Sequence, residues 1–164
     1  MSTRLIVIRG NSGSGKSTVA RDVRLRYGRG CALVEQDYLR RNLLREHESI
    51  QEPIAPELIG LNVRFALEHG YHVILEGILD RNRYGDMIAG LRREHAGETY
   101  VFYLDVAFEE TLRRHTTRPQ SVAFTGDQMR AWYRERDLLG LPGERIVPQS
   151  STQEETVSLI SAVL

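Results

Sequence analysis

The sequence has little cysteine, almost no lysine and no long hydrophobic run. Its single cysteine, Cys31, excludes an internal disulfide and any multi-cysteine zinc site. No stretch approaches the roughly 18 apolar residues of a membrane-spanning helix, and the apolar run near the start is too short for a signal-peptide core. These absences lead us to expect a cytoplasmic protein with no membrane partner.

An excess of charge of either sign is also missing. Lys plus Arg number 22 and Asp plus Glu number 22, so the formal net charge is zero. This balance removes the non-specific attraction expected of a protein that coats nucleic acid or an anionic membrane. An anionic partner must therefore be bound locally. The length of 164 residues and the hydrophobic fraction of 41% predict one folded domain over residues 1–164.

Short apolar runs alternate along the chain with longer stretches of helical spacing. The runs predict strands at residues 5–8, 31–35, 72–76, 99–104 and 145–147. The longer stretches predict helices at residues 16–27, 57–68, 83–94, 108–114, 127–139 and 154–163. This alternation predicts an α/β fold with a parallel sheet between helices, because parallel neighbours need a crossover connection. The least regular stretches, 41–56 and 115–126, are predicted to be mobile loops.

The most specific motif lies between the first strand and the first helix. It reads Gly10-Asn-Ser-Gly-Ser-Gly-Lys16-Ser17 and fits G-x-x-x-x-G-K-[ST]. Its glycines let the backbone approach a polyphosphate, and its N–H groups and the following helix N-terminus attract negative charge. Lys16, the only lysine beside 21 arginines, is suited to the β- and γ-phosphates, and Ser17 to Mg²⁺. The predicted nucleotide-binding residues here are Gly10, Asn11, Ser12, Gly13, Ser14, Gly15, Lys16, Ser17 and Thr18.

This segment resembles the Walker A loop of P-loop nucleoside triphosphatases and kinases. The resemblance implies a three-layer fold in which a five-stranded parallel sheet, with the strand order 2-3-1-4-5, lies between helices. It also implies ATP or GTP as the nucleotide, Mg²⁺ as the metal and a short lid at about residues 115–126.

A candidate general base follows the second predicted strand. Ligands of parallel sheets bind beyond the carboxyl ends of the strands, so Asp37 would face the phosphate loop. There it could accept the proton of an acceptor hydroxyl during in-line attack on the γ-phosphate. The structural alternative is a helix N-cap, and both roles could hold together. Arg40 would lie one turn further on, suited to bind the acceptor, or it could be a solvated arginine like Arg41.

A second carboxylate ends the third predicted strand. Glu76 resembles a degenerate Walker B acid that holds Mg²⁺ through water and contacts the substrate. The alternative is a surface glutamate at a strand end. Arg81 follows closely and is predicted, with Asp80 and Arg83, to line the acceptor pocket. The alternative for Arg83 is a place on a solvated helix face.

Two arginines near the predicted lid complete the candidate site. Arg114 and Arg118 are spaced like the paired lid arginines of small P-loop kinases, a resemblance that implies nucleotide binding by Arg114 and charge stabilisation by Arg118. Dipole compensation at a helix C-terminus accounts for Arg114 equally well, but not for Arg118.

The Asp37-Tyr-Leu-Arg40 element, with residues 124–133, resembles the kinase domain of bacteriophage-type polynucleotide 5′-kinases. Chloramphenicol phosphotransferases and zeta-toxin sugar-nucleotide kinases are similar in plan. The chain departs from the polynucleotide kinases in two respects. Its acid after the third strand is Glu76 followed by Gly77, and we expect no attached phosphatase-like domain.

We therefore predict an ATP- and Mg²⁺-dependent kinase that transfers the γ-phosphate to a hydroxyl of a small molecule, such as a nucleoside, sugar or antibiotic. Lys16, Asp37 and Arg118 form its predicted catalytic set. A polynucleotide 5′-end is the second hypothesis, less favoured because a strand-binding groove usually brings a basic surplus. A nucleotide-binding switch or ATPase is the third. The resemblance to small P-loop kinases implies that residues 147–150 hold the adenine ring. The oligomeric state stays open.

Overall fold

Five parallel strands form one sheet in the part of the chain that the computed structural model describes, residues 2–46, 54–117 and 125–164. The strands are β1 (Arg4–Gly10), β2 (Cys31–Glu35), β3 (His72–Gly77), β4 (Glu98–Asp105) and β5 (Arg145–Pro148). Their order across the sheet is β2-β3-β1-β4-β5, and every neighbouring pair is parallel. The predicted fold class and strand order are therefore confirmed.

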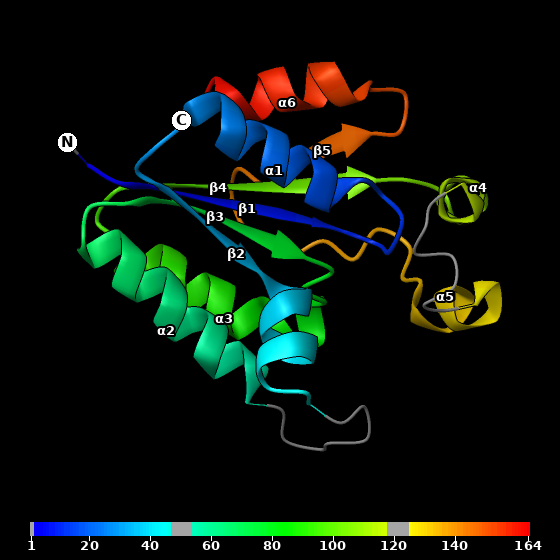
Figure 1. Cartoon of the computed structure of the whole chain (residues 1–164), viewed down its shortest axis with the longest axis horizontal. Coiled ribbons are helices and arrows are strands. Elements are labelled where there is room, and N and C mark those ends of the chain that lie inside the picture. Colours follow the sequence, from blue (N-terminus) through cyan, green and yellow to red (C-terminus); the bar gives the residue numbers. More distant parts are fainter. Residues whose placement is uncertain (1, 47–53, 118–124) are drawn as a thin grey trace.

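Helices cover both faces of this sheet, as Figure 1 shows. The helical elements are α1 (Lys16–Tyr27), the π-helix η1 (Tyr38–Leu43), α2 (Ala55–Glu68), α3 (Arg81–Glu94), α4 (Phe108–Thr116), α5 (Gly126–Trp132) and α6 (Gln153–Ser161). Helices α1 and α6 lie on one face and α2 and α3 on the other, while α4 and α5 lie beyond the carboxyl ends of the strands (Figure 1). None of the described helices is both long enough and apolar enough to cross a membrane.

The central strand β1 explains why the sheet is buried on both faces. Alternate residues of a strand point to opposite faces. Leu5 and Val7 pack in the core with α2 and α3, whereas Ile6 and Ile8 pack in the core with α1 and α6. All four are fully buried. The apolar run of residues 5–8 therefore fills two hydrophobic cores, and the strand ends at Gly10, where the phosphate loop begins.

The predicted helix at residues 127–139 is wrong over its second half, because α5 ends at Trp132. The backbone of Tyr133 is extended, with φ −64° and ψ 129°. The next residue, Arg134, donates its N–H to Oδ1 of Asn11 at 2.9 Å and accepts a hydrogen bond from Asn11 Nδ2 at 2.7 Å. Because these contacts occupy both backbone groups of Arg134, tertiary hydrogen bonds replace those of a helix.

The two-sided core predicts a large effect of truncating β1. Ile6→Ala should lower the free energy of unfolding by about 2–5 kcal/mol, because it removes buried methyl groups and leaves a cavity. The control is Leu25→Ala on α1, where the native side chain is 82% exposed, and its effect should stay within about 0.5 kcal/mol. Urea denaturation measures both. Equal, small effects would contradict the described packing.

Candidate active site

The phosphate loop leads directly from β1 into α1, and its glycines are required by the backbone path. Gly13 and Gly15 have φ values of +79° and +96°, in the left-handed region that favours glycine. A Cβ on Gly10 would lie 2.8 Å from Ser14 Oγ and 2.9 Å from the carbonyl oxygen of Leu104. The first turn of α1 contains no acidic residue, so its N-terminal N–H groups offer an anion site without a competing carboxylate in that turn.

Two side chains of the loop are buried and polar. Lys16 is 7% exposed and donates from Nζ to the carbonyl oxygen of Asn11 at 3.0 Å. The hydroxyl of Ser14 is buried and has no hydrogen-bond partner among the described residues. A buried polar group without a partner is unfavourable, and a phosphate oxygen at the loop would relieve this.

Ser17 and Glu76 meet at the start of α1 and the end of β3. The Ser17 hydroxyl donates to Oε1 and Oε2 of Glu76, at 3.1 and 3.2 Å. Burial raises the pKa of Glu76 above its ordinary value, although the charge of Lys16 and the hydrogen bond from Ser17 oppose that rise. Glu76 is 3% exposed, so it is not the surface glutamate of the alternative reading.

The oxygen atoms of Ser17 and Glu76 fit Mg²⁺. Among the described residues no three His, Cys, Asp or Glu side chains gather in a way that could hold a metal ion. Mg²⁺ needs no such group, because it usually binds one or two protein oxygens and completes its shell with water and substrate phosphates. These two side chains would hold it at the phosphate loop.

Asp37 lies where β2 ends and lines a pocket of about 420 Å³ together with Ser17 and Glu76. Its backbone is helical, with φ −63° and ψ −36°, and its side chain makes no capping hydrogen bond. Asp37 therefore occupies the N-cap position of η1, as the structural alternative expects, but its carboxylate does not cap the helix. The carboxylate is 65% exposed and lies 3.5 Å from Nε of Arg41. It is therefore accessible, in a pocket that Ser17 and Thr18 at the start of α1 also line.

The predicted acceptor-binding arginines lie in different surroundings. Nε of Arg40 pairs with the carboxylate of Glu46 at 3.1 Å, and both side chains are largely buried. Arg40 lines a second pocket beside Asp37, to which Arg83 also contributes. Arg81, the first residue of α3, is exposed and is not among the residues that line this pocket.

A third pocket, of about 380 Å³, lies on the other side of the phosphate loop. Its apolar lining comes from the end of β4 and the residue after it, from β5 and from α1, where Leu104, Val106, Val147, Pro148 and Val19 contribute. All four of the residues 147–150 line it, together with Ser14 and Gly15 of the phosphate loop. Its position and lining suit a purine ring whose phosphates continue into the loop.

Arg114 reaches the phosphate loop from the last turn of α4. Its NH1 donates to the carbonyl oxygen of Ser14 at 3.2 Å, and its Nε donates to Glu110 at 2.7 Å. Hydrogen bonds from Arg113 and Arg114 lower the pKa of Glu110 to about 2. Arg118 lies outside the described residues, as do residues 118–124 of the predicted lid.

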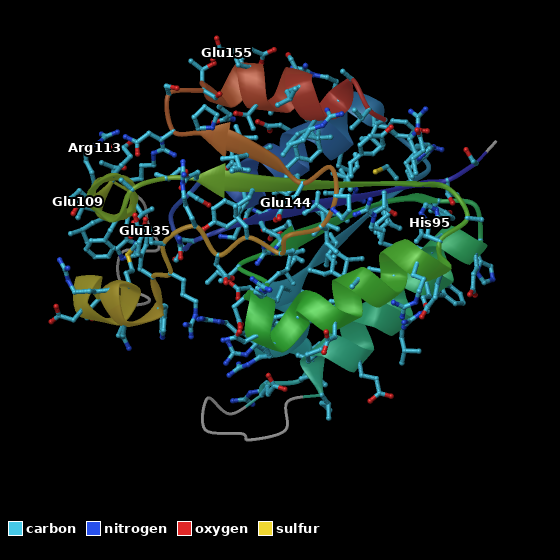
Figure 2. The ribbon with its side chains drawn as sticks, turned by 180° about the vertical axis from the view of Figure 1, so that it is seen from behind. His95, Glu109, Arg113, Glu135, Glu144 and Glu155 are labelled. Atoms are coloured by element: carbon cyan, nitrogen blue, oxygen red, sulfur yellow. The ribbon has the colours of Figure 1, made fainter. Side chains whose placement is uncertain are left out.

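Sequence reasoning missed a buried arginine next to the phosphate loop. Arg9 is fully buried, and its guanidinium pairs with Asp137 at 3.0 Å and with Glu144 at 3.2 Å. Its Nε and NH2 also donate to the carbonyl oxygen of Leu79, at 3.0 and 2.9 Å. Glu144 lies in the chain between α5 and β5, near the centre of the molecule in Figure 2. This cluster joins β1 to the segments that follow β3 and α5.

Solved structures share this fold over nearly the whole chain. One is the APS kinase CysC of Mycobacterium tuberculosis in complex with AMPPNP and APS, with a TM-score of 0.75, 16% identity, and coverage of 99% of this chain and 97% of that one. Another is a gluconokinase of Sinorhizobium meliloti 1021, with a TM-score of 0.66, 20% identity, and coverage of 98% and 91%. A Pnkp1/Rnl/Hen1 complex matches 75% of this chain and 43% of that one, with a TM-score of 0.56 and 23% identity.

The sheet order, the phosphate loop and these likenesses define the fold of small P-loop kinases. The chain belongs to the family described as "AAA domain", whose profile matches residues 5–137. No curated protein matches the sequence. The family match spans the phosphate loop, Asp37, Glu76 and Arg114.

Because Glu76 is buried, the substitution Glu76→Gln should change the free energy of unfolding in a way that depends on pH. The prediction applies to the protein without nucleotide. A carboxyl group whose pKa rises on folding stabilises the protein less as pH increases from its ordinary value of 4.5 through the raised value. Glutamine is neutral throughout, so the variant should gain stability relative to the native protein as pH rises through that window. Urea denaturation at several pH values measures this difference. A variant that loses stability relative to the native protein as pH rises through this window would contradict the assignment.

Proposed function

We propose that the protein is an ATP- and Mg²⁺-dependent phosphotransferase that transfers the γ-phosphate to a hydroxyl group of a small-molecule acceptor. The observation that carries the proposal is the shared pocket of Asp37, Ser17 and Glu76. It combines a candidate base, a candidate metal site and the end of the phosphate loop. A nucleotide switch has no need of an accessible carboxylate at this place.

The reaction transfers one phosphoryl group and moves one proton. The acceptor hydroxyl oxygen attacks the γ-phosphorus, a new O–P bond forms, and the bond from the γ-phosphorus to the bridging oxygen of ADP breaks. ADP leaves with that electron pair, and Asp37 takes the hydroxyl proton. General bases of this kind contribute about 10²- to 10⁴-fold to the rate.

Positive charge around the transferred group comes from the phosphate loop and α1, from Arg114 and Arg118, and from Mg²⁺. Lys16 and the N–H groups at the start of α1 bind the β- and γ-phosphates, and Arg114 approaches from α4. Mg²⁺, held by Ser17 and Glu76 when bound, neutralises charge on the phosphate oxygens. We assign Arg118 the same charge-stabilising role on the basis of its spacing from Arg114 alone.

Replacing Asp37 tests the proposed base. Asp37→Asn keeps the size of the side chain but cannot take the proton, so kcat should fall by about 10²- to 10⁴-fold while the affinity for ATP stays nearly unchanged. The matched control is Asp86→Asn on the exposed surface of α3, which should retain activity. Transfer of label from γ-labelled ATP to a panel of hydroxyl acceptors measures turnover.

The same assay separates the competing functions. Label on small hydroxyl compounds supports the proposal, and label on 5′-hydroxyl oligonucleotides alone would favour a polynucleotide kinase. Label found only as free phosphate under every condition would contradict both and favour an ATPase or switch. Full turnover by Asp37→Asn would identify another group as the base.

A further inference from the structure

Asp37 also lines a second pocket, of about 300 Å³, formed by η1, the chain after β3 and the end of α5. We call it the arginine pocket. Its charged lining residues are Asp37, Arg40, Arg41, Asp80, Arg83 and Arg134. Four guanidinium groups against two carboxylates give this pocket an excess of positive charge in a chain whose formal net charge is zero. Such a local excess favours an anionic ligand.

Two of the four guanidinium groups are already compensated. Arg40 pairs with Glu46 at 3.1 Å, and Arg41 pairs with Asp37 at 3.5 Å. The guanidinium groups of Arg83 and Arg134 form no ion pair with any other residue in the described ranges, and both residues are exposed. They are therefore available to a ligand, and the planar arginine group binds phosphate with two parallel hydrogen bonds.

Hydrogen bonds to neighbouring residues of the site fix the backbone of both arginines. Asn11 of the phosphate loop, 5% exposed, holds both backbone groups of Arg134 at 2.9 and 2.7 Å. Arg83 lies in the first turn of α3, where its N–H donates to the capping carboxylate of Asp80 at 3.1 Å. Because rigid backbone presents both side chains, the pocket is suited to recognise a group at a defined place.

On the basis of the proposed function, we propose that the acceptor is a phosphorylated hydroxyl compound whose phosphate binds Arg83 and Arg134 while its hydroxyl lies at Asp37. Asp37 is common to the arginine pocket and to the pocket of Ser17 and Glu76. A ligand in the arginine pocket therefore has the candidate base beside it. A volume of about 300 Å³ suits a small molecule such as a nucleotide or a sugar phosphate.

Matched acceptors test this inference. Adenosine is compared with adenosine 3′-monophosphate and adenosine 5′-monophosphate, glucose with glucose 6-phosphate, and a 5′-hydroxyl dinucleotide serves as the nucleic-acid probe. At least one phosphorylated compound should exceed its neutral counterpart about ten- to hundredfold in kcat/KM, because charge-assisted hydrogen bonds to phosphate are lost without it. Which pair shows the effect identifies the source of the phosphate. Equal turnover within every pair would overturn the inference but leave the proposed function standing.

Substitutions of the two arginines provide a second test of the inference. Arg134→Gln and Arg83→Gln should each raise KM for the phosphorylated acceptor about tenfold or more, without changing KM for ATP or for the neutral counterpart. The control is Arg93→Gln, an exposed arginine in the last turn of α3, which should change neither KM. An unchanged KM in both pocket variants would overturn the inference.

Equilibrium binding makes the test independent of turnover. Calorimetry with the same phosphorylated compounds, in the absence of ATP, should show binding to the native protein that Arg134→Gln weakens about tenfold. No binding of any phosphorylated compound to the native protein would overturn the inference even if neutral acceptors are phosphorylated. Failure to transfer label to any acceptor would count against the proposed function instead.

Discussion

The interaction on which the proposed site depends is the attraction that the N-terminus of α1 would exert on a polyphosphate. Everything around it serves to expose that N-terminus. Glycines with positive φ turn the chain from β1 into α1, and the first turn of the helix contains no acidic residue that would neutralise it. Lys16 adds a buried charge, and Ser14 adds a buried hydroxyl that lacks a partner among the described residues. The energetic advantage of such a site is greatest where water is excluded.

The sheet decides what surrounds this anion site. In a parallel sheet all strands end at one edge, so β2 and β3 bring Asp37 and Glu76 beside the phosphate loop, while β4 and β5 line the opposite pocket. The order β2-β3-β1-β4-β5 places the loop between these two groups. A nucleotide base on one side and an acceptor on the other would meet at the γ-phosphate. The proposed reaction is thus a consequence of strand order.

The sequence contained enough information to predict the local features of the site. The phosphate loop, the strands and Glu76 follow from glycine spacing and apolar runs, which are short-range signals. The partners of Arg9 and Asn11 could not be predicted from short-range signals. Asp137 lies 128 residues from Arg9 along the chain, and Arg134 lies 123 residues from Asn11. The sequence alone predicts that an arginine in a strand is exposed, because it does not show which distant carboxylates would pair with a buried guanidinium group. The helix predicted at residues 127–139 extends beyond the end of α5 for the same reason. Nothing in the sequence near Arg134 indicates its contact with Asn11.

The buried contacts of Arg9 and Asn11 hold the phosphate loop and the segment after α5 in one arrangement. Arg9 is the residue before Gly10, and Asn11 is the residue after it. Removal of one partner of a buried ion pair usually destabilises a protein strongly. The segment after α5, which contributes Arg134 to the arginine pocket, is therefore fixed relative to the phosphate loop. This rigid link relates the two ligands that the proposed reaction must bring together.

Calorimetric titration of ATP into the native protein, with and without Mg²⁺, tests the central claim most directly. The account predicts saturable binding of one nucleotide that Mg²⁺ strengthens and that Lys16→Gln weakens at least about tenfold, since a phosphate-binding charge is lost. Absence of binding to the native protein, or equal binding by native protein and variant, would contradict the claim that this loop is a nucleotide site.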